Sequence, residues 1–185
     1  MPTNKIIFGF VGLIASGKGT ACAYFKDKHN AGTHRFSTML RDVLTRLYIE
    51  HSREHLQNIS SAIRQYFGEE SLSKVMVEDV TRDAHQIVAI DGVRRPGDVE
   101  FLSKIPGFVL VQISADMAKR YERIVGRGEN SDDGSKTFEQ FKLDHEKEAE
   151  LQIADIAKHA TEHIDNNGTL EDLYQQLDAL IVKYS

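Results

Sequence analysis

The sequence contains no tryptophan, one cysteine and three prolines among its 185 residues. The single cysteine, Cys22, excludes a disulfide bond within the chain and suits a reducing compartment. The chain also lacks any apolar run near the ~20 residues that span a bilayer, and its start has neither the apolar block nor the cleavage site of a secretory signal. We therefore expect a cytoplasmic protein.

An excess of positive charge is absent as well, because 28 acidic side chains outnumber 23 basic ones and give a formal charge of −5. This balance argues against a nucleic acid or an anionic membrane as partner. With 41% hydrophobic and 28% charged residues, the composition is that of an ordinary folded protein. The length suits one α/β domain, residues 1–185, which we expect to be a monomer or homodimer.

Short apolar runs alternate with longer helical periodicities along the chain, which is typical of a parallel sheet covered by helices on both faces. β-branched and aromatic residues dominate the first, third and fourth runs, as expected of buried central strands. The predicted strands are Ile6–Val11, Thr33–Phe36, Ile87–Ile90, Phe108–Ile113 and His163–Asp165. The expected fold class is α/β, with a five-stranded parallel sheet between two helical layers.

Between the second and third predicted strands, apolar residues recur at helical spacing in Met39–Leu47, Leu56–Phe67 and Leu72–Val80. This stretch is longer than a crossover between parallel strands needs, so we expect residues 37–84 to carry a function. Further helices are predicted as Pro96–Leu102, one capped by Ser114 and running through Val125, one opened by a Thr137–Gln140 capping box, and Leu170–Ile181 after Thr169. The polar run Gly126–Lys136 is expected to be a mobile loop.

The segment GLIASGKGT, residues 12–20, follows the first predicted strand and opens a helix. That context separates a phosphate-binding loop, or P-loop, from a chance match. Glycines let successive backbone N–H groups turn toward phosphate oxygens, and the helix N-terminus adds partial positive charge. Lys18 would reach the β- and γ-phosphates. The residues expected to bind the nucleotide here are Ala15, Ser16, Gly17, Lys18, Gly19 and Thr20. A glycine-rich turn with a solvated lysine is the alternative.

Two residues are predicted to hold Mg²⁺. In this loop the residue after Lys18 is Gly19, so the hydroxyl that would meet the metal comes one position later, at Thr20. The second candidate is Asp91, at the end of the third predicted strand. An acid at the tip of an apolar strand beside a P-loop can hold Mg²⁺ directly or through water. A simple turn at Asp91 and Gly92 is the alternative.

Arginines gather at two places in the sequence. Arg41 and Arg94 follow the second and third strands, so both would project from the carboxyl edge of the sheet, where ligands bind in open α/β folds. Arg120, Arg123 and Arg127 precede the polar loop at helical spacing. Guanidinium groups suit phosphate oxygens and can neutralise the charge that develops during phosphoryl transfer. For each arginine alone, an exposed ion pair is the alternative.

The tip of the second strand carries Ser37 and Thr38 but no aspartate or glutamate. An alcohol acceptor usually needs a carboxylate base nearby, whereas an acceptor phosphate is already a deprotonated nucleophile. This absence favours a nucleoside monophosphate over a hydroxyl as the acceptor. Asp42 or Glu54 could still supply a base.

These motifs resemble those of P-loop kinases in the nucleoside monophosphate kinase and dephospho-coenzyme A kinase group. The Gly-Lys-Gly-Thr order is that of adenylate kinases, which have a glycine where this chain has Ala15. Phe36–Arg41 is similar to their acceptor motif, with two residues missing after Thr38, and the resemblance implies that Ser37 and Arg41 bind the acceptor. Arg94 is implied to bind the acceptor phosphate too, although the order of proline and arginine differs.

The segments Asp91–Phe101, Arg123–Asp133 and Ile164–Leu173 resemble in particular the archaeal adenylate-kinase-like proteins and their bacterial relatives. The resemblance implies that Arg123 and Arg127 are lid arginines, the second of them at the transferred phosphate or the ATP base. It also implies that Asn167 and Gly168 lie beside the adenine, although a tight turn would explain them as well. Adenylate kinases of the long type insert a larger lid domain, for which Gly128–Thr137 is too short, so we expect a brief loop-helix lid within residues 120–137.

The expected protein is thus an ATP- and Mg²⁺-dependent kinase that phosphorylates a nucleoside or deoxynucleoside monophosphate, a small-molecule partner. Its catalytic residues would be Lys18, Arg94, Arg123 and Arg127. One rival is transfer to a hydroxyl, as in dephospho-coenzyme A kinases. The other is a nucleotide-dependent regulatory or assembly ATPase, which a large exposed apolar patch on the helices between Met39 and Val80 would favour.

Overall fold

The structure, a computed structural model, describes residues 5–127, 137–145 and 148–185. The strands are β1 (Ile6–Val11), β2 (Gly32–Arg35), β3 (Ile87–Asp91), β4 (Phe108–Ser114) and β5 (Glu162–Asp165). The helices are α1 (Lys18–His29), α2 (Phe36–Arg46), α3 (Arg53–Phe67), α4 (Ser71–Arg82), α5 (Pro96–Leu102), α6 (Met117–Arg127), α7 (Phe138–His145), α8 (Glu148–Ala157) and α9 (Leu170–Tyr184).

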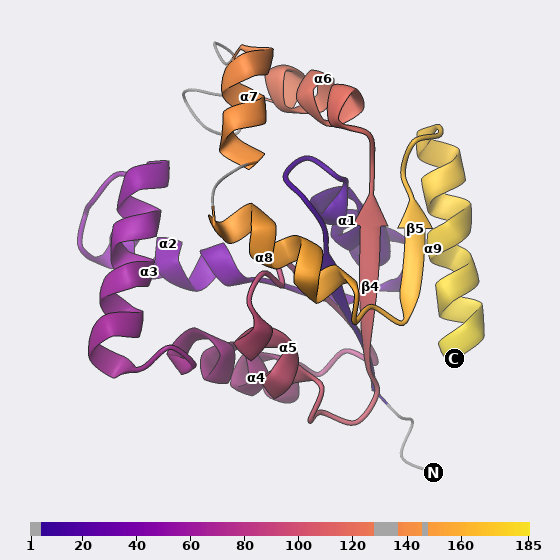
Figure 1. Cartoon of the computed structure of the whole chain (residues 1–185). Coiled ribbons are helices and arrows are strands. Elements are labelled where there is room, and N and C mark those ends of the chain that lie inside the picture. Colours follow the sequence, from indigo (N-terminus) through magenta and orange to yellow (C-terminus); the bar gives the residue numbers. More distant parts are fainter. Residues whose placement is uncertain (1–4, 128–136, 146–147) are drawn as a thin grey trace.

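The five strands form one parallel sheet in the order β2-β3-β1-β4-β5 (Figure 1). β1 lies at the centre, and all of its residues are buried. Phe8 of β1 pairs with Ala89 of β3 on one side and with Val109 of β4 on the other. Because β2 and β3 lie on one side of β1 and β4 and β5 on the other, the loop after Val11 opens at the point where the strand order reverses, where ligands bind in such sheets.

Helices cover both faces of the sheet. On one face, α1 and α9 bring Phe25 and Leu177 against Phe8. On the other, α4, α5 and α8 pack over a second core that contains Ile7 and Leu102. Neighbouring residues of β1 thus point into different cores, as the alternation of side chains along a strand requires. The predicted three-layer α/β fold is confirmed.

Two predicted boundaries are wrong, each because of strand pairing. The β2 ladder ends where Arg35 lies opposite Asp91, so Phe36 is not a strand residue and begins α2. Ser114 does not cap a helix, because it is the last residue of β4 and still pairs with β5. The helix that follows, α6, begins at Met117.

The other two predicted caps, at Thr137 and Thr169, are present. The Thr137 amide donates to Gln140 Oε1 at 2.9 Å, and the Gln140 amide donates to Thr137 Oγ1 at 3.2 Å, which fixes the start of α7. Thr169 and Asp172 make the same reciprocal pair at the start of α9. Such pairs satisfy amides that a helix N-terminus leaves without partners.

Helices α2 and α3 lie at the side of the layered part of the molecule (Figure 1). Tyr48, after α2, is 92% exposed, and Phe67, at the end of α3, is 77% exposed. The large exposed apolar side chains of α2, α3, α4 and their connections are Val43, Leu47, Tyr48, Ile49, Tyr66, Phe67 and Val75. Within the predicted acceptor region, residues 37–84, helices α2 and α3 are therefore packed less tightly than the sheet, whereas α4 contributes Met76 and Val80 to the second core. Over the ranges that the structure describes, no helix has the length and apolar character needed to cross a membrane.

Candidate functional site

The P-loop connects β1 with α1 at the carboxyl end of the central strand. Gly17, directly before α1, has a φ of 112°, in the left-handed region that glycine tolerates. A Cβ atom at Gly17 would also lie only 2.2 Å from Asn166 Nδ2, so a larger residue would displace the neighbouring loop. Ala15 has a φ of 60°, a conformation that costs a residue with a Cβ roughly 1–2 kcal/mol. The loop therefore keeps its bend against a conformational penalty.

Lys18, the first residue of α1, is 6% exposed and folds back over the loop. Its Nζ donates hydrogen bonds to the carbonyl oxygens of Gly12, at 2.7 Å, and Leu13, at 3.0 Å. Hydrogen bonds from a charged donor are stronger than neutral ones, so these two carbonyls fix the ammonium beside the loop. A positive charge held there fits the predicted role of Lys18 at the β- and γ-phosphates.

The two predicted metal ligands meet at the first turn of α1. The Asp91 carboxylate lies beside this turn, with Oδ2 3.7 Å from where a Cβ on Gly19 would be, and Thr20 is exposed on it. Two oxygen donors fit Mg²⁺, which keeps several waters and phosphate oxygens as its other ligands. Arg35 Nε pairs with Asp91 Oδ2 at 3.2 Å and so competes with a metal for this oxygen. Within the described residues, no group of three or more His, Cys, Asp or Glu side chains could hold a metal.

Asn166, a residue without an assigned role in the sequence, ties the P-loop to the end of β5. It is 5% exposed, and its Nδ2 donates to the Ser16 carbonyl at 2.8 Å. Its own amide donates to the Ser114 carbonyl at 2.8 Å, and its carbonyl accepts from Arg123 Nη2 at 2.9 Å. The side chain of Asn166 thus holds the loop, and its backbone holds β4 and α6.

The neighbours of Asn166, predicted to lie beside the adenine, are more exposed. Asn167 is half-buried, its Oδ1 accepts from the Asp116 amide at 2.8 Å, and its carbonyl accepts from Lys119. Gly168 is exposed. These contacts fix the segment against the start of α6. They do not involve a nucleotide, so the position of Asn167 and Gly168 beside the adenine stays a prediction.

The arginines of α6 differ in their surroundings. Arg120 is 3% exposed; its Nε donates to the Ala115 carbonyl at 2.9 Å, and its Nη1 donates to the Ile14 carbonyl of the P-loop at 3.3 Å. Arg123 Nη1 is buried and has no hydrogen-bond partner in the described part of the chain. The Arg127 side chain lies outside what the structure describes, as do residues 128–136 of the predicted mobile loop and lid.

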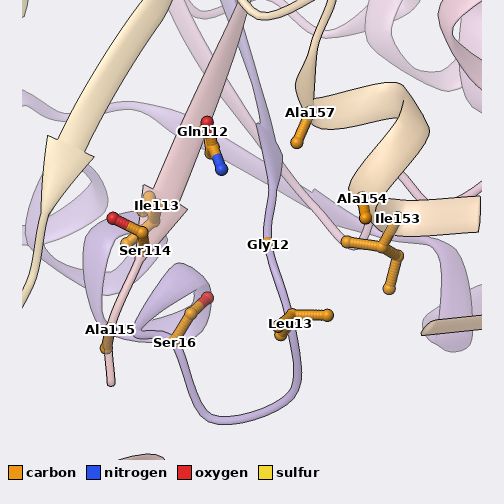
Figure 2. A pocket seen from close by; sticks show the side chains of 10 residues that line it. All are labelled: Gly12, Leu13, Ser16, Gln112, Ile113, Ser114, Ala115, Ile153, Ala154 and Ala157. Carbon is orange, nitrogen blue, oxygen red and sulfur yellow. The ribbon is translucent and has the colours of Figure 1, made fainter. Parts of the chain in front are cut away.

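A cavity of about 180 Å³ lies between the P-loop, the end of β4 and α8. Ser16 Oγ is buried, lines this cavity and has no hydrogen-bond partner among the described residues (Figure 2). Ile153 and Ala157 of α8 form the facing wall. Ligand pockets usually measure roughly 300–1,000 Å³, so this space suits ordered water rather than a nucleotide base.

The predicted acceptor residues follow two neighbouring strands, β2 and β3, at one side of the sheet. Arg41 is half-buried on α2 and Arg94 is exposed after β3, and neither side chain makes an ion pair or hydrogen bond within the described ranges. Ser37 Oγ is buried without a partner there. The structure thus brings these residues to one edge without binding them to each other.

Asp98, a residue that the sequence did not single out, shapes the loop that carries Arg94. It is 2% exposed, and its Oδ2 accepts from the backbone amides of Arg94, at 3.1 Å, and Arg95, at 3.0 Å. Its Oδ1 accepts from Ser73 Oγ at 2.7 Å. A buried carboxylate therefore holds the loop to α4.

Arg64 of α3 is a second residue that sequence reasoning missed. It is 8% exposed, its Nη1 donates to the Glu69 carbonyl at 2.5 Å, and its Nε has no hydrogen-bond partner among the described residues. Burial lowers the pKa of Arg64, and the charge of Arg95 lowers it further. Arg95 pairs in turn with the Glu69 carboxylate at 3.4 Å. Glu69 thus links both arginines at the turn between α3 and α4.

Cys22 takes no part in this chemistry. It is buried in the core between the sheet and α1, and burial raises the pKa of its thiol well above the usual value. A thiol that stays protonated is a poor nucleophile. Cys22 is therefore a packing residue.

Comparison with known proteins shows what the chain resembles. A scan against models of known protein families finds no match. A UPF0200 protein of Sulfurisphaera tokodaii is 27% identical to this chain over 177 residues, which is 95% of each. Its name states no activity.

Solved structures share the fold at low sequence identity. A shikimate kinase of Bacteroides thetaiotaomicron superposes with a TM-score of 0.65 at 13% identity and covers 96% of this chain and 97% of its own. TT1252 from Thermus thermophilus gives a TM-score of 0.63 at 16% identity, over 98% of this chain and 99% of its own. The chain thus has the three-layer fold of P-loop kinases.

Proposed function

We propose that the protein is a kinase that transfers the γ-phosphoryl group of ATP to a nucleoside or deoxynucleoside monophosphate. One arrangement carries this proposal: a P-loop with a buried lysine stands beside a sheet edge that presents Arg41 and Arg94, whose side chains are free of partners in the described part of the chain. Guanidinium groups left unpaired at the edge of a phosphate site suit a second anion.

The chemistry follows from the groups that this edge holds. A phosphate oxygen of the acceptor attacks the γ-phosphorus in line, one P–O bond forms as the bond to ADP breaks, and no proton has to leave the nucleophile. Lys18 would follow the transferred group, and Arg41 and Arg94 would hold the acceptor. Mg²⁺, when bound at Thr20 and Asp91, supplies neutralising charge.

The absence of a base at the tip of β2 favours phosphate over hydroxyl as the acceptor. Ser37 and Thr38 lie in the first turn of α2 there, and Asp42 and Glu54, the acids that could still supply a base, are both exposed. Ser37 Oγ, buried and without a partner among the described residues, can donate to an acceptor phosphate oxygen. Residues 37–84 would form the acceptor-binding region, and residues 120–137, with Arg123 and Arg127, the lid.

A panel of acceptors tests the proposal. ATP and Mg²⁺ are incubated with each ribo- and deoxyribonucleoside monophosphate, with dephospho-coenzyme A and with shikimate, and phosphorus NMR identifies the products. We expect a nucleoside diphosphate from at least one monophosphate, and a weaker reaction with the Arg41→Ala and Arg94→Ala variants. Transfer to a hydroxyl compound alone would overturn the proposal.

A second candidate function is a nucleotide-dependent regulator that acts through a protein partner. The exposed apolar side chains of α2, α3 and their connection favour it, since Tyr48, Tyr66 and Phe67 are each more than three-quarters exposed, at 92%, 76% and 77%. The acceptor panel separates the two functions. A regulator would hydrolyse ATP slowly and phosphorylate none of the small molecules.

A further inference from the structure

Arg120 is the residue of α6 that touches the P-loop. Its guanidinium donates to the carbonyls of Ala115 and Ile14, and it lies over the ring of Phe141 of α7, 5.6 Å from the ring centroid. At 3% exposure it is not a solvated surface charge. It therefore connects the apex of the P-loop with the end of β4 and with α7.

The contact at Ile14 has a consequence for the next amide. No peptide bond is cis in the described part of the chain, so the Ile14 carbonyl and the Ala15 N–H point in opposite directions from the same plane. An Ile14 oxygen that is held toward Arg120 leaves the Ala15 N–H directed away from it. Backbone amides of a P-loop bind phosphate only when they turn inward together.

The preference of Ala15 works against this orientation. Its φ of 60° lies in the left-handed region, which is unfavourable for a residue with a Cβ. A flip of the peptide between Ile14 and Ala15 would let Ala15 return to a negative φ and would turn its amide around. The chain thus needs an interaction that holds the peptide, and the hydrogen bond from Arg120 is one.

We propose that Arg120 is a positioning residue that holds the Ile14–Ala15 peptide in the orientation in which the Ala15 amide can bind a nucleotide phosphate. This inference rests on the proposed nucleotide binding at the P-loop, but it does not depend on which acceptor is used. Because Arg120 belongs to α6 and contacts Phe141 of α7, the conformation of the loop also depends on where these two helices lie.

ADP binding to a set of variants tests the inference, with affinities measured by calorimetry. Arg120→Lys keeps the charge but lacks the planar fork that reaches two carbonyls, and we expect it to weaken ADP binding about tenfold, the effect of losing one charge-assisted hydrogen bond. Ala15→Gly removes the penalty on the left-handed conformation. A double variant combines Ala15→Gly with Arg120→Lys. We expect it to bind ADP with an affinity within about threefold of that of the Ala15→Gly single variant.

Controls separate positioning from general destabilisation. Glu122→Gln changes an exposed residue of the same helix and should bind ADP as the unmodified protein does. Circular dichroism and thermal unfolding check the fold of each variant. The Ala15 amide, followed by nitrogen-15 NMR, should shift on adding ADP to the unmodified protein and shift little in Arg120→Lys.

Two results would overturn the inference: an Arg120→Lys variant that binds ADP as tightly as the unmodified protein, or a double variant that is not rescued by glycine. Both are distinct from failure of the proposed function. A protein that binds ADP with this dependence on Arg120 but phosphorylates no monophosphate would refute the kinase proposal and support the role of Arg120.

Discussion

The two halves of the candidate site are built differently. On the P-loop side, Lys18 is bonded to Gly12, Asn166 to Ser16, and Arg120 to Ile14, so the loop is fastened from three directions. On the acceptor side, Arg41 and Arg94 make no side-chain ion pair or hydrogen bond within the described ranges.

This difference shows how a site can be rigid toward one ligand and adaptable toward another. A pre-formed P-loop loses little conformational entropy when phosphate binds. Arginine side chains without partners lose conformational entropy when they bind the acceptor. Part of the free energy of acceptor binding therefore offsets this loss, by an amount that differs from one acceptor to another. We expect changes on the P-loop side to affect turnover and changes on the acceptor side to affect acceptor KM.

The largest effect is expected at Lys18. Lys18→Met removes a charge placed against developing negative charge and should lower turnover by roughly two or more orders of magnitude. A coupled assay of ADP release measures this. Lys26→Met, an exposed lysine of the same helix, is the matched control and should retain activity. An active Lys18→Met enzyme would show that the lysine of the P-loop side is not needed for phosphoryl transfer.

Changes at the acceptor arginines should have the next largest effect. Arg41→Ala and Arg94→Ala each remove one guanidinium from the predicted acceptor phosphate and should raise acceptor KM about 10- to 100-fold. The KM for ATP should stay within about threefold of its original value. Steady-state kinetics with each substrate varied in turn measure both constants. Equal increases in both KM values would mean that the two halves are not separate.

Asp98→Asn tests whether the loop that bears Arg94 must be held in place for the acceptor to bind. The amide oxygen of the variant can still accept from the Arg94 and Arg95 amides, but the NH2 group that replaces Oδ1 cannot accept from Ser73 Oγ, and the negative charge is lost. We therefore expect a loss of about 1–3 kcal/mol in the free energy of unfolding. Acceptor KM should rise as well, because the loop bearing Arg94 loosens. Urea unfolding and kinetics on the same samples give both values. Lower stability with unchanged acceptor KM would mean that Asp98 serves the fold alone.

Asp83 lies in the predicted acceptor region, where α4 ends. Its carboxylate makes hydrogen bonds with His34 of β2 and with His85. Burial alone would raise the pKa of Asp83, but hydrogen bonds from His85 and His34 lower it to about 2 from 3.8. A lowered pKa adds stability that is complete above the unfolded value of 3.8 and is lost as the pH falls through about 2.

Asp83→Asn should therefore lower the unfolding temperature at pH 7, and the difference from the unmodified protein should shrink between pH 4 and pH 2, an interval set by the two pKa values. Calorimetric scans across this range measure it. A difference that stays constant down to pH 2 would show that the ionised carboxylate is not what stabilises this junction.

The smallest effect is expected in the exposed connection that follows α2. Tyr48→Ser should change the free energy of unfolding by less than about 0.5 kcal/mol and leave phosphoryl transfer unchanged, because Tyr48 is 92% exposed. Chemical denaturation and the transfer assay check both values. A change in transfer would connect this surface with the acceptor half.

Local pattern was enough to predict the sheet and the P-loop. The apolar runs located each strand, and the strand-loop-helix context located Lys18 and Thr20. The cap at Ser114 was wrong because the pairing of β4 with β5, which a local pattern does not show, extends the strand through that serine.

The contacts that support the site could not be found in the same way, although the helical spacing before the polar loop had already singled out Arg120 as a candidate. Asn166 contacts a carbonyl 150 positions earlier, Arg120 contacts one 106 positions earlier, and Asp98 bonds to a serine 25 positions earlier. Each is an ordinary polar residue until the fold brings its partner near. No periodicity or motif records such a contact, so it depends on tertiary structure.

The contact between Asn166 and Ser16 also bears on how the protein is made. The P-loop leaves the ribosome before Asn166 does, because the side chain that holds it comes 150 positions later, after β5. A nascent chain that does not yet include Asn166 would have the lysine and glycines of the P-loop but not the hydrogen bond that holds the loop in its conformation. Tight nucleotide binding would then begin only after Asn166 has left the ribosome, and a fluorescent nucleotide added to stalled chains of increasing length would show the onset.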